Sequence, residues 1–150
     1  MHRVIELTIP GASPADVLAE LASLDRYPRW MRLVHRVEEL APDDGRPAWR
    51  VELRGRVGPF ARSKLLRMVR TRHEPDHAVR FERVERDGRQ HAAWILDAAV
   101  TPAAGGVALR VALTYTGALW GSAVLQRVFE DEVRRGEEAL RRLVSAEPTR

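Results

Sequence analysis

A change in hydrophobic period near residue 120 constrains the fold of this 150-residue chain more than any other feature. Residues 48–117 largely alternate between apolar and polar side chains, which is typical of β-strands whose two faces differ. Residues 121–145 instead place apolar side chains three or four positions apart, as an amphipathic helix does. The sequence therefore predicts a meander of antiparallel strands followed by one long helix.

The alternation, together with the turn residues between the runs, predicts seven strands. The Asp87-Gly88 pair is a strong hairpin signal and predicts a tight turn between the fifth and sixth strands. The facing of the fourth strand stays open, because Leu65-Leu66 and Met68-Val69 place apolar side chains on both parities. The expected strands are 3–9, 35–41, 48–57, 62–73, 78–86, 90–101 and 107–116.

Two short helices are predicted between the first two strands. The first has Ser13 as its N-cap, Pro14 at the first helical position and Asp16 at the third, which is a capping-box pattern. The Asp-Arg-Tyr-Pro segment at residues 25–28 interrupts this helix. A second short helical turn is predicted over residues 30–34.

The composition excludes several classes of protein. The chain has no cysteine, which rules out a disulfide scaffold, a thiolate metal site and a cysteine nucleophile. No run of 18 apolar residues is present, so we expect no membrane span. Glu6, Pro10 and Asp16 stand where a signal peptide needs an unbroken apolar core. We expect a single domain over residues 1–150 that works in the cytoplasm, and the sequence sets no oligomeric state.

The high pI of about 10.5 reflects arginine usage rather than a large net charge. Of the 25 cations, 24 are arginine, so a net charge of +4 is enough to raise the pI this far. Residues 46–89 hold 13 of the cations and 6 acids. Strand alternation predicts that most of these arginines lie on the outer face of the sheet as a solubilising surface. They are Arg50, Arg54, Arg70, Arg72 and Arg80.

This order of elements resembles the helix-grip fold of the START-like, or SRPBCC, superfamily, in particular its polyketide cyclase/dehydrase and coenzyme Q-binding branches. The resemblance covers nearly the whole chain. It rests on the Ser-Pro-Ala-Asp cap at 13–16, the Tyr-Pro-Arg-Trp segment at 27–30, the Gly-Gly turn at 105–106 and the terminal helix at 121–145. It implies an α+β fold in which a curved antiparallel sheet of about seven strands wraps around the C-terminal helix and leaves an apolar cavity.

The resemblance implies three hypotheses about function. The first is binding of a small hydrophobic molecule, such as a lipid, an isoprenoid or an aromatic polyketide, in that cavity. The second is a polyketide aromatase/cyclase that uses acid–base groups in the same cavity. The third is an RNA- or ribosome-associated module. The basic strands lack the interleaved aromatic residues of base-stacking surfaces, so nucleic acid is not the expected partner.

Two charged residues are candidates for a polar point inside the cavity. Glu132 and Gly136 fall within the apolar stripe of the predicted terminal helix. A carboxylate facing a sheet is costly to desolvate unless it is paired, so Glu132 could act on a ligand beside space left by Gly136. Alternatively, it reaches water or pairs with an arginine at the sheet edge. Arg67 is the natural partner of Glu132 if the face of the strand that carries Ser63 and Leu65 points inward. Otherwise, Arg67 is a solvated residue on the outer face of the sheet.

Apolar side chains of the strands and the terminal helix are expected either to line the cavity or to pack an ordinary core. The Tyr115 hydroxyl would provide a polar handle for a ligand. Glu132, Arg67 and Tyr115 are the candidate catalytic groups, with no role assigned. The expected ligand-binding residues are Trp30, Trp49, Phe60, Phe81, Trp94, Leu96, Leu113, Tyr115, Leu125, Phe129, Glu132 and Gly136.

No metal or cofactor is expected. His73 and His77 have i,i+4 spacing, but Pro75 between them prevents the helix that would direct both at one ion. The nucleophile-elbow, phosphate-loop and dinucleotide-binding motifs are all missing from the sequence. Phe60 and Trp120 are expected at the cavity mouth, either as a gate or as a cap over the core.

Overall fold

The computed structural model describes residues 1–57, 59–117 and 122–145. Within them the chain forms seven strands, two α-helices and one 3-10 helix, in the predicted order. The elements are β1 His2–Pro10, α1 Pro14–Leu21, η1 Leu24–Arg29, β2 Val34–Asp43, β3 Arg46–Val57, β4 Phe60–Glu74, β5 Ala78–Arg83, β6 Trp94–Ala103, β7 Gly106–Tyr115 and α2 Ser122–Ser145.

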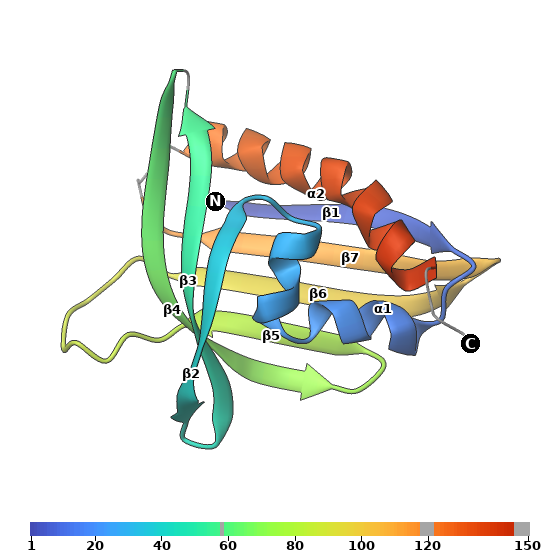
Figure 1. Cartoon of the computed structure of the whole chain (residues 1–150), viewed down its shortest axis with the longest axis horizontal. Helices are drawn as coiled ribbons and strands as arrows, with labels where there is room; N and C mark the ends of the chain where they lie inside the picture. The colour runs from blue at the N-terminus through green and yellow to red at the C-terminus, as the bar shows by residue number, and fades with distance from the viewer. Residues whose placement is uncertain (58, 118–121, 146–150) are drawn as a thin grey trace.

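The strands form one antiparallel sheet in the order β1-β7-β6-β5-β4-β3-β2. The sheet is strongly curved: β2, β3 and β4 stand at a steep angle to the other four strands (Figure 1). Register shifts interrupt β2 twice and β4 once, between Arg70 and Arg72. Such bulges increase the local twist of a strand, which lets the sheet bend around a helix.

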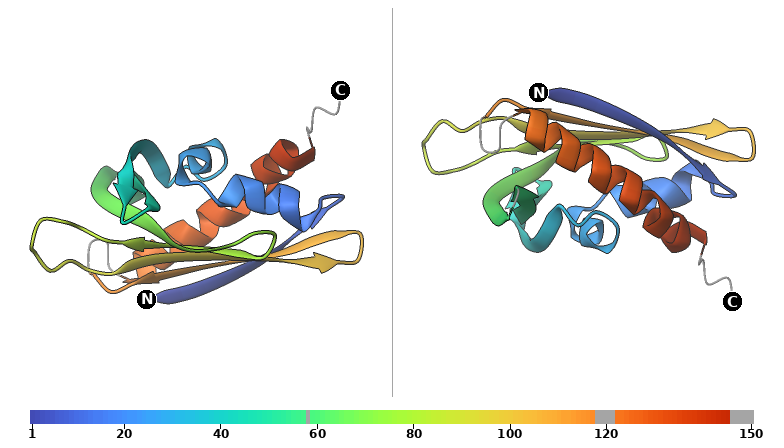
Figure 2. Two further views of the ribbon diagram at one scale, coloured as in Figure 1. Left: turned by 90° about the horizontal axis from the view of Figure 1, so that it is seen from below. Right: turned by 90° about the horizontal axis from the view of Figure 1, so that it is seen from above.

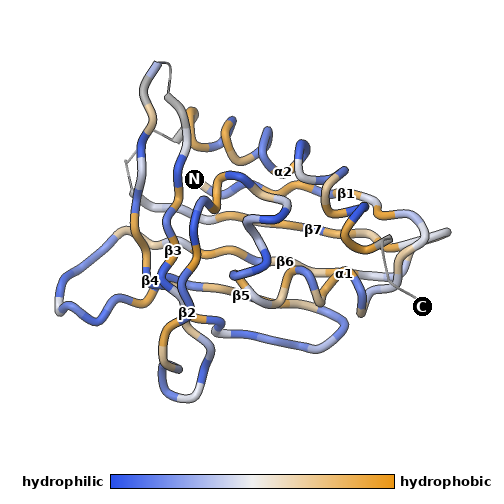
Figure 3. Tube along the Cα trace, viewed as in Figure 1, coloured by the Kyte–Doolittle hydropathy of each residue, from blue (hydrophilic) through white to orange (hydrophobic). Residues whose placement is uncertain are grey.

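All three helices lie on the concave face of the sheet (Figure 2). One stripe of α2 is buried against this face, and most of the other residues of the helix are hydrophilic (Figure 3). The other face of the sheet faces solvent. The fold is therefore the predicted α+β helix-grip arrangement. The buried residues of the α2 stripe are Leu125, Phe129, Val133, Leu140 and Val144.

The first predicted helix is confirmed, and the second lies earlier in the chain than expected. Ser13 Oγ accepts a hydrogen bond from the Asp16 backbone N–H at 3.2 Å and caps α1. The second helix is η1, at Leu24–Arg29, whereas the sequence analysis placed it over residues 30–34. The reason is that Leu24 and Tyr27, three residues apart, are both buried and hold this turn on the core.

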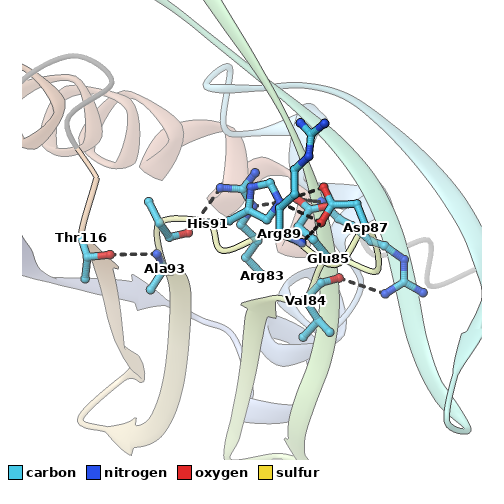
Figure 4. Close-up of polar contacts among 10 residues, drawn as sticks. Arg83, Val84, Glu85, Asp87, Arg89, His91, Ala93 and Thr116 are labelled. Atoms are coloured by element: carbon cyan, nitrogen blue, oxygen red, sulfur yellow. Dashed lines mark hydrogen bonds and ion pairs between the residues drawn. The ribbon is translucent and has the colours of Figure 1, made fainter.

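The predicted tight turn at Asp87-Gly88 is wrong. Strand β5 ends at Arg83 and β6 begins only at Trp94, so a ten-residue loop at 84–93 joins them. The Asp87 carboxylate accepts from the Arg89 backbone N–H at 3.0 Å and from the His91 ring at 2.8 Å, which closes the turn locally (Figure 4).

Side-chain bonds fix the 84–93 loop against the sheet (Figure 4). The Glu85 carboxylate accepts from the Arg67 backbone N–H at 3.1 Å and from Arg83 Nε at 2.7 Å. At the far end of the loop, the Ala93 backbone N–H donates to Thr116 Oγ1 at 2.8 Å. These contacts replace the regular strand pairing that a two-residue hairpin would have continued.

Asp43 joins three segments on the outer side of the sheet. Its buried carboxylate, at the end of β2, accepts from Arg67 on β4 at 2.6 Å and from Arg86 Nε in the 84–93 loop at 3.0 Å. The Arg86 and Arg67 guanidinium groups hold the pKa of Asp43 at about 2. Since an ordinary aspartate has a pKa of 3.8, Asp43 stabilises the fold only in its ionised form.

Replacing Asp43 with Asn tests the contacts of Asp43 with Arg67 and Arg86, because their contribution to the free energy of unfolding depends on pH. Because the folded-state pKa is depressed, the contribution is fully present above about pH 4 and is lost as the pH falls toward 2. Urea denaturation should show Asp43→Asn less stable than the native chain at pH 6, with the difference closing by pH 2. The exposed neighbour Asp44→Asn is the control, expected within about 0.5 kcal/mol throughout. A difference that persists unchanged at pH 2 would contradict the account.

Gly136 lets α2 approach the segment after η1. A Cβ at this position would collide with the Trp30 carbonyl oxygen and lie 2.9 Å from Cε3 of its indole. Gly136 is therefore required by the close contact between helix and backbone, and its space is occupied by Trp30. The expectation that it opens a pocket beside Glu132 is wrong.

Gly136→Ala should destabilise the protein although alanine is the better helix former. The overpacking cost of about 2 to 3 kcal/mol exceeds the gain of about 1 kcal/mol in helix propensity. Urea denaturation should therefore show a net loss of about 1 to 2 kcal/mol. Arg134→Ala, on the exposed face of the same helix, serves as the control and should change stability by less than about 0.5 kcal/mol. A Gly136→Ala variant as stable as the native chain would refute the close contact.

Candidate functional site

An apolar cavity of about 40 Å³ lies between the concave face of the sheet and α2. Its lining comes from η1, the start of β2, four further strands and α2. This volume is little more than the roughly 30 Å³ that a water molecule occupies in the liquid. The interior is therefore nearly filled. The lining residues are Leu24, Met31, Leu33, Val34, Val51, Leu53, Leu66, Met68, Trp94, Leu96, Leu113 and Phe129.

Trp94 lines this cavity and carries a buried hydrogen-bond donor without a partner. The residue is 2% exposed, and its indole N–H has no acceptor among the described residues. Its ring packs on Tyr115, with the ring centroids 4.4 Å apart. Buried polar groups are nearly always satisfied, so an orphaned donor in an apolar lining calls for an explanation.

A second, larger space of about 510 Å³ opens next to the cavity. The two spaces lie close together, because neighbouring residues of the same segments line them. Arg32 and His35 line the outer space, whereas Leu33 and Val34 between them line the cavity. We refer to this outer space as the mouth, and most of its lining residues are polar or charged. Its lining residues are Arg32, His35, Arg54, Gly55, Ala61, Val128, Asp131, Glu132 and Arg135.

Glu132 lies in this mouth and connects α2 to the segment before β2. Its carboxylate accepts from the Arg32 backbone N–H at 3.1 Å, from the Arg32 guanidinium at 3.5 Å and from Arg135 at 2.9 Å. The side chain is 13% exposed, so the pairs compensate its desolvation. Among the alternatives considered from sequence, pairing with arginine is the one observed, although Arg32 was not foreseen as the partner.

Arg67 is not the partner of Glu132. Leu66 and Met68 of β4 are buried on the concave side, while Leu65 is 57% exposed, so Arg67 lies on the outer face with Asp43. The alternative in which Arg67 faces the cavity is therefore wrong.

The arginine of β4 that reaches the helix side is Arg70. It donates to the Ala22 carbonyl at the end of α1, at 2.8 Å, and partial burial lowers its pKa. The sequence analysis had placed Arg70 on the outer face. Arg70 has the same parity as the inward residues Leu66 and Met68, so that expectation failed with the choice of the inner face of the strand.

The structure brings four of the expected ligand-binding residues together at the cavity: Trp94, Leu96, Leu113 and Phe129. Others are buried in the surrounding core. Trp49 and Phe81 pack edge to face at 5.5 Å, and the Trp49 indole N–H donates to Asp25 at 3.1 Å. Trp30, Tyr115, Leu125 and Gly136 are likewise buried but do not line the cavity.

Sequence reasoning missed the wall formed by Met31, Leu33 and Val34, because these residues were assigned to a helical turn. The inner parity of β4, with Leu66 and Met68, could not be chosen from a strand apolar on both sides. The expected gate rests on Phe60 and Trp120. Trp120 and the Phe60 side chain lie outside what the structure describes.

Two features of the described residues concern metal ions and membranes. In residues 1–57, 59–117 and 122–145, no group of three or more His, Asp or Glu side chains is arranged to hold a metal ion. No helix in those same ranges is long and apolar enough to cross a membrane.

Comparison with solved structures shows the same fold in several bacterial proteins. TTHA0849 from Thermus thermophilus has a TM-score of 0.69 at 19% identity, over 97% of this chain and 98% of that one. A START superfamily protein from Mycobacterium smegmatis gives 0.66 at 16%, over 97% of both chains. The di-domain aromatase/cyclase StfQ of steffimycin biosynthesis gives 0.62 at 16%, over 97% of this chain and 49% of that one.

No curated protein matches the chain. A family model does: the family described as polyketide cyclase / dehydrase and lipid transport matches residues 2–145, almost the full length. With the helix-grip fold and START-like structural neighbours in agreement, the chain belongs to this polyketide cyclase/dehydrase and lipid transport family.

Proposed function

We propose that this protein binds a small hydrophobic molecule, such as a lipid, an isoprenoid or an aromatic polyketide, between the sheet and α2. The observation that carries the proposal is the unpartnered indole N–H of Trp94, a residue that lines the apolar cavity. Burial of apolar ligand surface would provide most of the binding free energy, at about 25 cal/mol per Å². The cytoplasmic location expected from the sequence remains part of the proposal.

The Trp94 N–H would select ligands that carry a hydrogen-bond acceptor. A buried donor without a partner costs about 1 to 3 kcal/mol, because it has left water and gained nothing in return. A ligand carbonyl or ether oxygen beside Trp94 would remove this cost. The preferred ligand therefore combines an extensive apolar skeleton with at least one acceptor oxygen.

Ligand entry requires the cavity to widen, since ligand sites generally measure about 300 to 1,000 Å³. Met31 and Met68 line the cavity, and methionine side chains repack easily because they are unbranched and flexible. The mouth lies directly behind Leu33 and Val34. We propose that movement of this segment away from α2, with loss of the Arg32–Glu132 contact, joins the two spaces.

Binding is favoured over catalysis by the chemistry of the lining. A cyclase would need acid–base groups beside the ligand, and the described lining of the cavity holds no carboxylate, imidazole or amine. Glu132, the most buried carboxylate of the mouth, already accepts from Arg32 and Arg135. The family description includes both polyketide cyclisation and lipid transport. The residues of this cavity support lipid transport.

Two probes with one ring skeleton test the proposal: anthraquinone, which has carbonyl oxygens, and anthracene, which lacks them. The native protein should bind anthraquinone about tenfold more tightly, as one hydrogen bond of about 1.4 kcal/mol provides. Trp94→Phe keeps an aromatic ring but removes the N–H, so it should bind the two probes equally. Fluorescence quenching titration measures both affinities.

Trp49→Phe is the matched control, because its N–H donates to Asp25 rather than to the cavity. This variant should keep the preference for anthraquinone. If neither probe binds the native protein at its solubility limit, the proposed function is wrong. If both bind equally well, the function stands and the role of Trp94 is wrong.

A further inference from the structure

The β3–β4 hairpin extends past the start of α2 (Figure 1) and has an unusual charge. Residues 53–64 contain Arg54, Arg56, Arg62 and Lys64 and no acidic residue. No ion pair involves Arg54, Arg62 or Lys64 among the described residues, although most arginines of the sheet have an acidic partner. Residues 53–64 of the hairpin therefore carry a net charge of +4.

The cations lie on both faces of the hairpin. In the strand register, Leu53 pairs with Lys64 and Arg54 pairs with Ser63, and paired residues share a face. Lys64 is therefore on the side of buried Leu53, and Arg54 is on the opposite side. A ribbon charged on both faces attracts a negatively charged surface along its length.

Exposed apolar side chains lie close to this cationic hairpin. In the described parts of the chain, only two large apolar side chains are exposed: Leu65 on β4, at 57%, and Val124 in the first turn of α2, at 37%. Val124 lies one turn before Val128, which lines the mouth together with Gly55 and Ala61 of the hairpin. Val124 is therefore close to the mouth, whereas Leu65 lies on the outer face of the hairpin, beside Lys64 and Glu52.

We infer that the β3–β4 hairpin, with Leu65 and Val124, docks the protein on the surface of an anionic lipid bilayer. Clustered Lys and Arg are attracted to anionic head groups, and adjacent apolar side chains can enter the interface. Docking would place the mouth at the membrane surface. An RNA surface fits less well, because every aromatic side chain that the structure describes is buried and none is free to stack on bases.

Vesicle sedimentation tests this inference independently of the proposed cavity ligand. The native protein should bind phosphatidylcholine vesicles containing about 30% phosphatidylserine and should not bind pure phosphatidylcholine vesicles. Raising the salt from about 0.05 M to about 0.5 M should release it. Arg62→Gln/Lys64→Gln, at positions outside the cavity lining, should lower the partition coefficient about 25-fold, since each interfacial cation contributes about fivefold.

Arg46→Gln/Arg89→Gln is the matched control. It removes the same net charge, but Arg46 begins β3 at the end opposite the hairpin and Arg89 lies in the 84–93 loop. This control should lower binding by less than about threefold. Leu65→Ser should weaken binding at every salt concentration and leave its salt dependence unchanged.

Three results would overturn the inference. The first is no binding to the anionic vesicles at low salt. The second is an equal loss in the hairpin variant and the control, which would mean that net charge alone drives the interaction. The third is tighter binding to single-stranded polyuridylate than to vesicles, lost in Arg62→Gln/Lys64→Gln, which would assign the hairpin to RNA.

Discussion

The burial of one helix stripe against the concave face of a curved sheet is the interaction on which the rest of this structure depends. Leu125, Phe129 and Val133 of α2 cover a sheet that could not keep its apolar face in water. The bulge in β4 supplies the curvature, and Gly136 lets the helix come close to the segment before β2. Once the helix is in place, the size and position of any interior space are fixed by side chains from both layers.

Polar groups divide into two sets on this framework. On the outer face several are paired: Asp43 joins Arg67 and Arg86, which links the end of β2 to the 84–93 loop. On the inner side they are few. Glu132 bonds to Arg32 at the mouth, and the buried indole N–H groups of Trp30 and Trp94 have no acceptor among the described residues. The buried Trp94 donor without a partner on the inner side supports the proposal that the protein binds a ligand there.

The fold could be predicted from the sequence because it follows from periodicity, capping and element order, which are local signals. The site could be predicted only in part. The inner positions of Trp94 and Leu113 follow from alternation, but the facing of β4 does not, because this strand is apolar on both parities. The pairing of Glu132 with Arg32 joins residues 100 positions apart, and no periodic pattern identifies such a partner.

Native mass spectrometry most directly tests the claim that the cavity holds an apolar molecule. The protein would be purified from its own host without detergent, and measured before and after incubation with that host's lipid extract. The account predicts a one-to-one complex with an apolar, oxygen-bearing molecule that organic solvent releases. A spectrum showing only the bare chain, unchanged after the incubation, would contradict it.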